Sequence, residues 1–219
     1  MERPGWEPRR VVAVEPVLPE GATPPGTRGR ILREALALFA EAGFAGTSIR
    51  RIASAVGINS ATPYAHHPSK EHVLAALVAT GHEELHARLA EAAARTGRDG
   101  PAERLTALVR AHVLIHTDFP LLALVADAEI HALSPERAAP ALALRHTCRR
   151  FLLDVVEDGV ARGDFAVPDV LLAAGAISAM GVRVPAWFDP DQAFTRERVA
   201  RDHAEFALRV VGASAPPRS

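Results

Sequence analysis

The sequence predicts an all-α protein in which a small N-terminal unit of three helices is followed by a larger helical bundle. Apolar residues recur at helical spacing along most of the 219 residues, which is the pattern of amphipathic helices. No segment shows the sustained apolar and polar alternation of a half-buried strand. A hydrophobic content of 48% is enough to bury a core.

The first 26 residues hold six prolines and three glycines, a composition that opposes regular helix. We therefore expect a flexible arm over residues 1–26. Arg9 and Arg10, with Arg28 and Arg30 just beyond, fit a basic arm that reaches into a minor groove. The arm also carries four glutamates, which fit a leader without any role equally well.

An amphipathic helix is predicted next, over residues 28–42. Ile31, Ala35 and Leu38 lie at helical spacing, and Gly43 is suited to end the helix.

Two short helices are expected after it. Thr47 or Ser48 can cap the first of them, and Gly57 suits a tight turn with positive φ at its end. Asn59 or Ser60 can then open the second.

The rest of the chain is divided into helices by proline, glycine and capping residues. We expect these helices over residues 70–95, 101–117, 120–133, 140–162, 168–182 and 195–211.

Charge is unevenly distributed along the chain. Residues 27–70 carry six basic and two acidic residues, a net charge of +4, whereas the whole chain has −1 and the remainder therefore −5. A local positive patch on an acidic protein is typical of a nucleic-acid reader. A solvated basic face explains the same charge.

Two short helices around a glycine turn, with a supporting helix before them, match the helix-turn-helix, whose second short helix lies in the major groove. An ordinary helical hairpin has the same outline. The second short helix also carries compact polar side chains that can reach phosphates or base edges. The candidates for DNA contact are Arg28, Thr47, Ser48, Arg50, Asn59, Ser60, Ala61, Thr62, Tyr64, His66 and Lys70.

The segment Thr27–Leu77 resembles, without a gap, the DNA-binding domain of the TetR family of bacterial transcriptional regulators. The resemblance implies that Tyr64 and Lys70 hold phosphates and that residues 59–62 approach the bases. It is carried by Phe39, Gly43, Phe44, Thr47, Ser48, Ile52, Ala53, Gly57, Tyr64, Pro68, Ser69 and Lys70.

Two residues depart from the family pattern. Pro63 stands where an apolar residue such as leucine is usual; with Ser60 as the N-cap it is the third helical residue, whose N–H has no intrahelical partner in any case. His67 replaces the usual phenylalanine and makes the plug beneath Tyr64 more polar. This gives the hypothesis that DNA binding depends on pH.

Residues 168–182 have almost no polar face, which implies burial on all sides. The resemblance implies that this helix and the last one form the dimer, and a palindromic operator requires a two-fold dimer. We therefore expect a homodimer, a helix-turn-helix domain over residues 27–72, a ligand-binding and dimerisation domain over residues 73–212, and a flexible tail over residues 213–219.

The segment Ala186–Thr195 is similar to a tryptophan-aromatic-x-proline turn of TetR-family members that sense acyl-CoA or lipid-like ligands. The resemblance implies a repressor that a small amphipathic effector releases from its operator, with an acyl-CoA or lipid-like molecule as one candidate. Aromatic residues such as Trp187 and Phe188 more often belong to a core or an interface than to a pocket wall. The candidates for ligand binding are His112, His116, Arg145, Arg183 and Trp187.

An enzymatic alternative comes from the segment His82–His86, which matches the zinc-protease pattern H-E-x-x-H. The longer metalloprotease pattern needs glycine and histidine where this chain has Leu89 and Ala92. We expect no catalytic residues, metal or cofactor. A metal- or pH-sensing regulator on the same scaffold, and a zinc hydrolase through His82, Glu83 and His86, remain as alternatives.

The cellular setting is indicated by three absences in the sequence. Cys148 is the sole cysteine, so no internal disulfide and no cysteine-based zinc site can form. No signal peptide and no apolar run long enough to cross a bilayer are evident. We expect a cytoplasmic protein that has no membrane partner.

Overall fold

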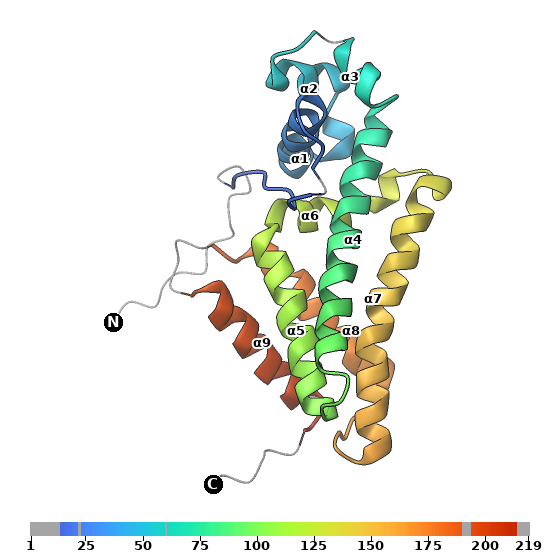
Figure 1. The fold of residues 1–219 in the computed structure, drawn as a ribbon, viewed down its shortest axis with the longest axis vertical. Coiled ribbons are helices and arrows are strands. Elements are labelled where there is room, and N and C mark those ends of the chain that lie inside the picture. The colour runs from blue at the N-terminus through green and yellow to red at the C-terminus, as the bar shows by residue number, and fades with distance from the viewer. Residues whose placement is uncertain (1–13, 22, 60, 190–193, 214–219) are drawn as a thin grey trace. The chain divides into compact units, whose positions relative to one another are not determined.

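The computed structural model describes residues 14–21, 23–59, 61–189 and 194–213. Within them all regular structure is helical and no strand occurs, which confirms the predicted all-α class. The α-helices (Figure 1) are α1 (Thr27–Gly46), α2 (Ile49–Val56), α3 (Thr62–His66), α4 (Lys70–Arg95), α5 (Pro101–Asp118), α6 (Pro120–Ala128), α7 (Pro135–Arg162), α8 (Val170–Val182) and α9 (Arg196–Val210), and the 3₁₀ turns are η2 (Ile130–Ala132) and η3 (Val184–Ala186).

The described chain divides into two compact units by its internal contacts. Unit 1 comprises the described residues up to His82, Asp118–Ala141 and Pro185–Asp189. Unit 2 comprises Glu83–Thr117, Leu142–Val184 and the described residues from Phe194 onward. Helices α4 and α7 contribute several residues to each unit, and α5 lies in unit 2 except for its last residue, Asp118.

Helix α1 supplies much of the core of unit 1. Ile31, Ala35 and Leu36 are fully buried and Phe39 is nearly so, which confirms the apolar stripe that predicted this helix. Gly43 adopts a positive φ of 70°, as expected of a glycine at a helix end. The chain then makes one further helical turn, so α1 continues to Gly46 with a kink at Gly43.

Helix α2 has the predicted cap and turn. Ser48 is its N-cap, and the Ser48 hydroxyl accepts a hydrogen bond of 3.2 Å from the backbone N–H of Arg51. Gly57 ends the helix in the left-handed conformation, with φ 73°. The predicted requirement for glycine at this turn is confirmed, because other residues adopt such a φ at a cost.

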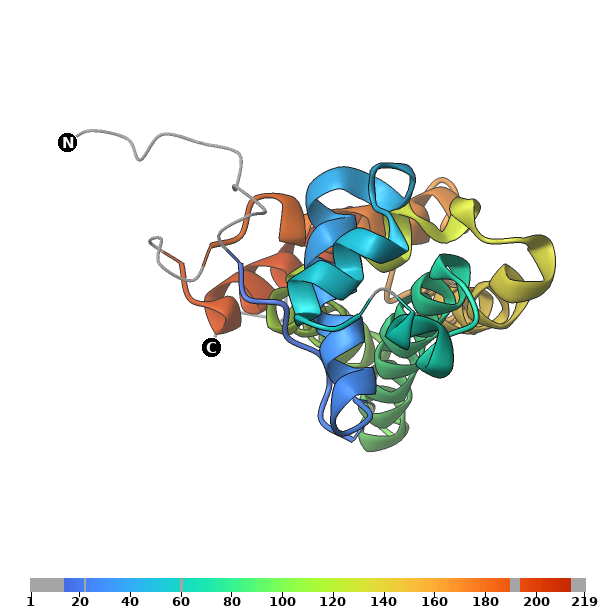
Figure 2. The ribbon, with the colours of Figure 1, turned by 90° about the horizontal axis from the view of Figure 1, so that it is seen from above.

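Helix α3 begins later than the sequence suggested. The Asn59 Oδ1 atom accepts a hydrogen bond of 2.9 Å from the backbone N–H of Ala61, and the first helical residue is Thr62. Pro63 is then the second helical residue, where its missing N–H has no intrahelical partner to lose. Ser60 lies outside the described residues. Figure 2 looks onto α1, α2 and α3, with the first turns of α4 beside them.

The described residues before α1 pack onto unit 1 rather than standing clear of it. Leu18 is 8% exposed and belongs to the same apolar cluster as Ile31 and Leu36. At Gly29 a Cβ atom would lie 2.2 Å from the carbonyl oxygen of Pro24, so this segment crosses the first turn of α1. The described part of the expected arm over residues 1–26 therefore differs from a free arm, because Leu18 is buried in the cluster, although Val17 is 45% exposed.

The remaining helices follow the predicted order with shifted ends. Helix α4 has the predicted bounds, and Thr195 caps α9 by accepting a hydrogen bond of 3.2 Å from the backbone N–H of Arg198. Helix α6 is shorter than expected because the chain passes into η2. Helix α7 begins at Pro135, and Pro140, which was expected to begin it, lies within the helix.

Unit 2 has a core of its own, with Leu105, Val113 and Ile177 among its buried residues. Phe165 lies so close to Gly159 that a Cβ there would be 2.1 Å from the Phe165 ring. Within the described residues no single helix is long and apolar enough to cross a membrane. Helices α5 and α6 have the required length and apolar composition only as a pair, and the pair is bent by 100°.

Candidate functional site

The outer side of α3 carries the polar surface that the sequence predicted. Tyr64 is 53% exposed, and Ala61 and His66 are also exposed. On the other side of this short helix Pro63 is buried, and the next residue, His67, is 2% exposed. Burial of one side therefore turns the polar side outward.

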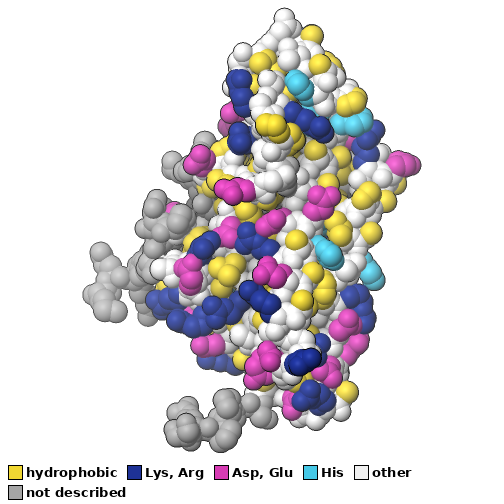
Figure 3. Space-filling model, in the orientation of Figure 1, with side chains coloured by type: hydrophobic (Ala, Val, Ile, Leu, Met, Phe, Trp, Pro, Cys, Tyr) yellow, Lys and Arg dark blue, Asp and Glu magenta, His cyan; other side chains and the backbone are white. Residues whose placement is uncertain are grey.

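Basic residues lie on the same unit. Arg28 at the start of α1 and Arg50 in α2 are exposed, whereas Arg51 pairs with Glu41 at 3.0 Å. Figure 3 shows Lys, Arg and His side chains around the α1 to α3 part of unit 1. Of the predicted contact residues, Arg28, Ser48, Arg50, Asn59, Ala61, Tyr64 and His66 are exposed and Thr62 is partly so.

Lys70 has a position that the sequence did not suggest. The Lys70 ammonium donates to the carbonyl oxygens of Phe44 and Thr47, at 2.6 and 2.7 Å. It also lies 3.9 Å from the centroid of the Phe44 ring, a cation–π distance. The side chain thus holds the end of α1, and one of its three N–H groups remains for a phosphate.

Thr47 is likewise turned inward. Its side chain is 2% exposed, and the hydroxyl lies 3.1 and 3.0 Å from the carbonyl oxygens of Leu38 and Gly43, to which it donates. The prediction grouped Thr47 with residues that face DNA, but the structure gives it the position of a bridge across the kink of α1.

His67 is buried without a full set of partners. Within the described residues its Nε2 atom has no hydrogen-bond partner. Burial is the main cause that lowers the pKa of His67, and the positive charges of Arg28, His66 and His72 lower it further. The plug beneath Tyr64 is therefore a neutral imidazole at neutral pH.

The ligand candidates fall into two places. His112 and His116 of α5 lie in unit 2 with ring centroids 4.5 Å apart, and Arg145 and Arg183 belong to the same unit. Arg183 is exposed. Trp187 belongs to unit 1, where its ring packs edge-on against that of Phe188, with centroids 6.5 Å apart.

His203 of α9 is a further polar residue of this region that was not among the predicted ligand contacts. Its charge contributes to lowering the pKa of His112, so His203 lies near the two histidines of α5. Sequence could reveal it only as part of the apolar stripe of the last helix, because the proximity depends on how α5 and α9 pack.

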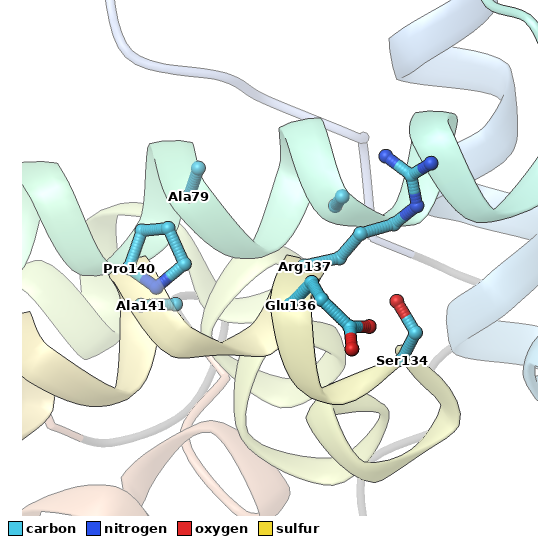
Figure 4. A pocket seen from close by; sticks show the side chains of 7 residues that line it. Ala79, Ser134, Glu136, Arg137, Pro140 and Ala141 are labelled. Atoms are coloured by element: carbon cyan, nitrogen blue, oxygen red, sulfur yellow. The ribbon is translucent and has the colours of Figure 1, made fainter.

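Unit 1 also contains a groove that no sequence pattern indicated. It has a volume of 510 Å³ and lies between α4 and the start of α7. Figure 4 shows the Arg137 guanidinium, Glu136 and Pro140 beside it. Arg137 is paired with Glu71 at 3.2 Å, and small side chains leave the space open. The lining residues are Ala75, Ala79, Ser134, Glu136, Arg137, Pro140 and Ala141.

The H-E-x-x-H segment shows no metal-binding arrangement. The His82 Nδ1 atom lies 2.8 Å from the carbonyl oxygen of Val78, and the His86 ring packs on Phe151 at 5.9 Å. Among the described residues no group of three metal-ligating side chains lies close enough to hold an ion. Cys148 is buried, and burial raises the pKa of its thiol to about 11, which makes the thiolate rare at neutral pH.

Helices α8 and α9 of unit 2 pack against each other and leave apolar residues uncovered. Leu171 and Leu172 of α8 are 57% and 75% exposed, and Phe206 and Val210 of α9 are 44% and 40% exposed. Burial of α8 on all sides, as its composition predicted, is therefore not reached within one chain.

Comparison with known families gives two matches that together span most of the chain. Residues 31–77 match the bacterial regulatory proteins of the tetR family. Residues 98–211 match the tetracyclin repressor-like C-terminal domain.

Individual relatives agree with these matches. The transcriptional repressor KstR2 of Rhodococcus jostii is 28% identical over 184 residues, which are 84% of this chain and 90% of the relative. A tetR-family regulatory protein from Rhodococcus RHA1 has a TM-score of 0.81 and 30% identity, covering 88% of this chain and 100% of that one. The ketosteroid transcriptional regulator KstR2 of Mycobacterium tuberculosis has a TM-score of 0.79 and 26% identity, covering 89% and 98%.

TetR-family regulators are typically not enzymes; they bind DNA as dimers and respond to small molecules. The polar outer side of α3, the helix-turn-helix that presents it and the matches over both parts of the chain lead to one conclusion: this chain belongs to the TetR family and is a ligand-responsive, DNA-binding transcriptional repressor.

Proposed function

We propose that this repressor reads its operator with the outer side of α3 and acts in the cytoplasm by binding rather than by catalysis. The observation that carries the proposal is the two-sidedness of α3: Tyr64 is 53% exposed while Pro63 and His67 are buried. A helix held in this way offers its polar side chains to a major groove. We assign DNA binding to residues 27–72, with Thr62 and Tyr64 at its centre.

The other exposed candidates have supporting roles in this proposal. Arg28 and Arg50 suit phosphates because a guanidinium pairs well with phosphate oxygens, and Ser48, Asn59 and His66 offer polar atoms nearby. Ala61 suits a thymine methyl group. Ser60, which lies outside the described residues, remains a predicted contact.

Dimerisation is proposed to use the uncovered apolar side chains of α8 and α9. Exposed apolar groups of this size are typical of protein interfaces. A second copy that presents the same helices covers them by two-fold symmetry. We assign dimerisation, with ligand binding, to residues 73–212. A minor-groove role for the arm and a flexible tail over residues 213–219 remain predictions.

The effector is proposed to be a small amphipathic molecule bound in unit 2, with an acyl-CoA or lipid-like compound as one candidate. His112 and His116 are the side chains best supported, because α5 brings their rings together. Arg145 and Arg183 of the same unit remain candidates, and Trp187, which belongs to unit 1, remains a separate candidate. The M. tuberculosis relative is described as a ketosteroid regulator, and a steroid skeleton, like the acyl chain of a lipid, is mainly apolar with few polar groups. An effector that binds better to the DNA-incompetent state lowers operator affinity by the ratio of its two affinities.

Selection of genomic fragments by the purified protein, at low salt and without effector, tests the proposal. We expect enrichment of a palindrome with two half-sites, and we expect Tyr64→Ala to weaken binding to it by about ten-fold or more. Leu142→Ala, at an exposed position of α7, is the matched control and should bind as the wild type does. Recovery of no palindrome would contradict the proposed function.

A further inference from the structure

Three histidines of unit 2 come together beside α8. His112 and His116 are one turn apart on α5 with their rings edge to face at 4.5 Å, and His203 of α9 is close enough for its charge to act on His112. A Cβ atom on the buried Gly181 of α8 would lie 2.4 Å from the His112 Nδ1 atom. The His112 ring therefore lies directly against the backbone of α8, in space that only glycine leaves free.

The backbone fixes how two of these rings present their nitrogens. The His116 Nδ1 atom lies 2.6 Å from the carbonyl oxygen of His112, and the His203 Nδ1 atom lies 2.8 Å from that of Val199. A carbonyl oxygen only accepts hydrogen bonds, so both Nδ1 atoms carry the proton. In their neutral forms these rings present Nε2 as an acceptor.

His112 differs from its two neighbours because no hydrogen bond to its ring occurs among the described residues. Burial is the main cause that lowers the pKa of His112 well below its ordinary value, followed by the charges of His116 and His203. The ring is therefore neutral at pH 7, with one N–H donor and one nitrogen acceptor. Part of its surface is still accessible, so a ligand group can reach it.

A half-buried polar group has few water molecules to bond with, and a ligand that supplies a hydrogen-bond partner is therefore favoured there. A hydroxyl or a carbonyl oxygen can do so without bringing charge. A carboxylate would lose its water beside the neutral imidazole of His112 and gain no cation from that ring in exchange. The surroundings of His112 thus favour a hydroxyl or carbonyl group over a carboxylate.

We propose that His112 recognises an uncharged hydroxyl or carbonyl group on an apolar effector, and that Gly181 provides the space its ring needs. The proposal rests on the proposed function in one respect, that unit 2 holds the effector. It limits the effector to molecules whose polar group beside His112 is neutral. Any anionic part of a larger effector must then bind elsewhere on the protein.

Binding of three eight-carbon probes to the full-length protein without DNA tests the proposal. The probes are 1-octanol, 1-chlorooctane, which has the same chain without a hydrogen-bonding hydroxyl, and octanoate. We expect 1-octanol to bind about ten-fold more tightly than either of the others. We also expect it to shift the NMR signal of the His112 ring, which is assigned by its loss in His112→Gln.

Matched variants separate recognition from folding. His112→Gln keeps a donor and an acceptor and should retain the preference for 1-octanol over 1-chlorooctane, whereas His112→Leu should abolish it at an unchanged melting temperature. Gly181→Ala, which displaces the ring, should act like His112→Leu. His146→Leu, at an exposed histidine of α7, should leave the preference intact.

The proposal is overturned if octanoate binds as tightly as 1-octanol, if His112→Leu keeps the preference, or if no probe shifts the His112 signal. None of these results depends on DNA. A failure to select an operator would instead contradict the proposed function and leave the assignment of His112 standing.

Discussion

At the scale of single residues, His67 gives the DNA-binding unit a dependence on pH. Its pKa is lowered in the folded protein, so the folded state resists a proton that the unfolded chain accepts near pH 6.5. The stabilisation is present above that pH and is lost as the pH falls below it toward the folded pKa. The charged and titratable groups acting on the ring are Arg28, His66 and His72.

We therefore expect the melting temperature of the wild type to fall between pH 8 and pH 6, and its operator affinity to fall as the pH approaches the lowered pKa of the folded ring. His67→Phe removes the titrating group and should show a weaker dependence on pH in both measurements. Melting curves and fluorescence anisotropy over that range give the answer. An operator affinity of the wild type that does not change with pH would remove the hypothesis.

The role of Lys70 can be tested by two measurements, the melting temperature of the protein and the salt dependence of operator binding. Its ammonium holds two carbonyl groups at the end of α1, and hydrogen bonds to charged groups contribute about 1.5–3 kcal/mol each. Lys70→Met should lower the melting temperature and weaken operator binding, because the end of α1 loses its clamp.

The slope of log affinity against log salt concentration separates this role from a phosphate contact. If Lys70 acts only as the clamp, the slope of Lys70→Met equals that of the wild type. A slope smaller by about 0.9, with an unchanged melting temperature, would show instead that Lys70 neutralises one phosphate.

At the scale of secondary-structure elements, the segment before α1 is part of the folded unit. Leu18 belongs to the apolar cluster, and Pro24 lies against Gly29. Replacement of a core leucine by alanine costs about 2–5 kcal/mol. Leu18 lies at the margin of its cluster, so Leu18→Ala should cost about 2 kcal/mol, measured by chemical unfolding.

Deletions separate this packing from a basic arm. Removal of residues 1–24 should destabilise the protein, whereas removal of residues 1–13 leaves Val14 and Leu18 in place and should not. If the shorter deletion reduces the salt slope of operator binding, Arg9 and Arg10 reach DNA. Equal melting temperatures for both deletions would contradict a structural role for residues 14–24.

Most elements could be predicted because their signals are local. The cap at Ser48, the left-handed Gly57 and the helical spacing of α4 depend on neighbouring residues alone, and all three are observed. The ends of α6 and α7 could not be placed, because two prolines, Pro135 and Pro140, offer equally good starts. The structure has the first of them, next to Ser134, whose backbone N–H donates a hydrogen bond of 2.8 Å to the distant Glu71.

In the candidate site, too, the local features could be predicted and the contacts between distant helices could not. The outward side of α3 follows from a short pattern, and the structure places Tyr64 and His66 on the surface. The inward positions of Thr47 and Lys70 depend on the meeting of α1 with the start of α4. The approach of His203 to His112 likewise joins distant helices, and a single sequence carries no record of such packing.

At the scale of the whole molecule, function requires two chains. Leu172 of α8 is 75% exposed and apolar, and a charge placed in an apolar interface loses its water without gaining a partner. Leu172→Glu should yield monomers in sedimentation and lose operator binding while its helical content stays unchanged. Glu157→Gln, at an exposed polar position of α7, is the control. A dimeric Leu172→Glu would show that another surface joins the chains.

The central claim is that two copies of α3, one from each chain, read the operator. Titration of the selected palindrome and of a single half-site, with stoichiometry measured by sedimentation, tests it most directly. We expect two chains per palindrome, an affinity for the palindrome far above that for the half-site, and a loss of about ten-fold or more in Tyr64→Ala. One chain per duplex with equal affinity for both DNAs, or undiminished binding by Tyr64→Ala, would contradict the account.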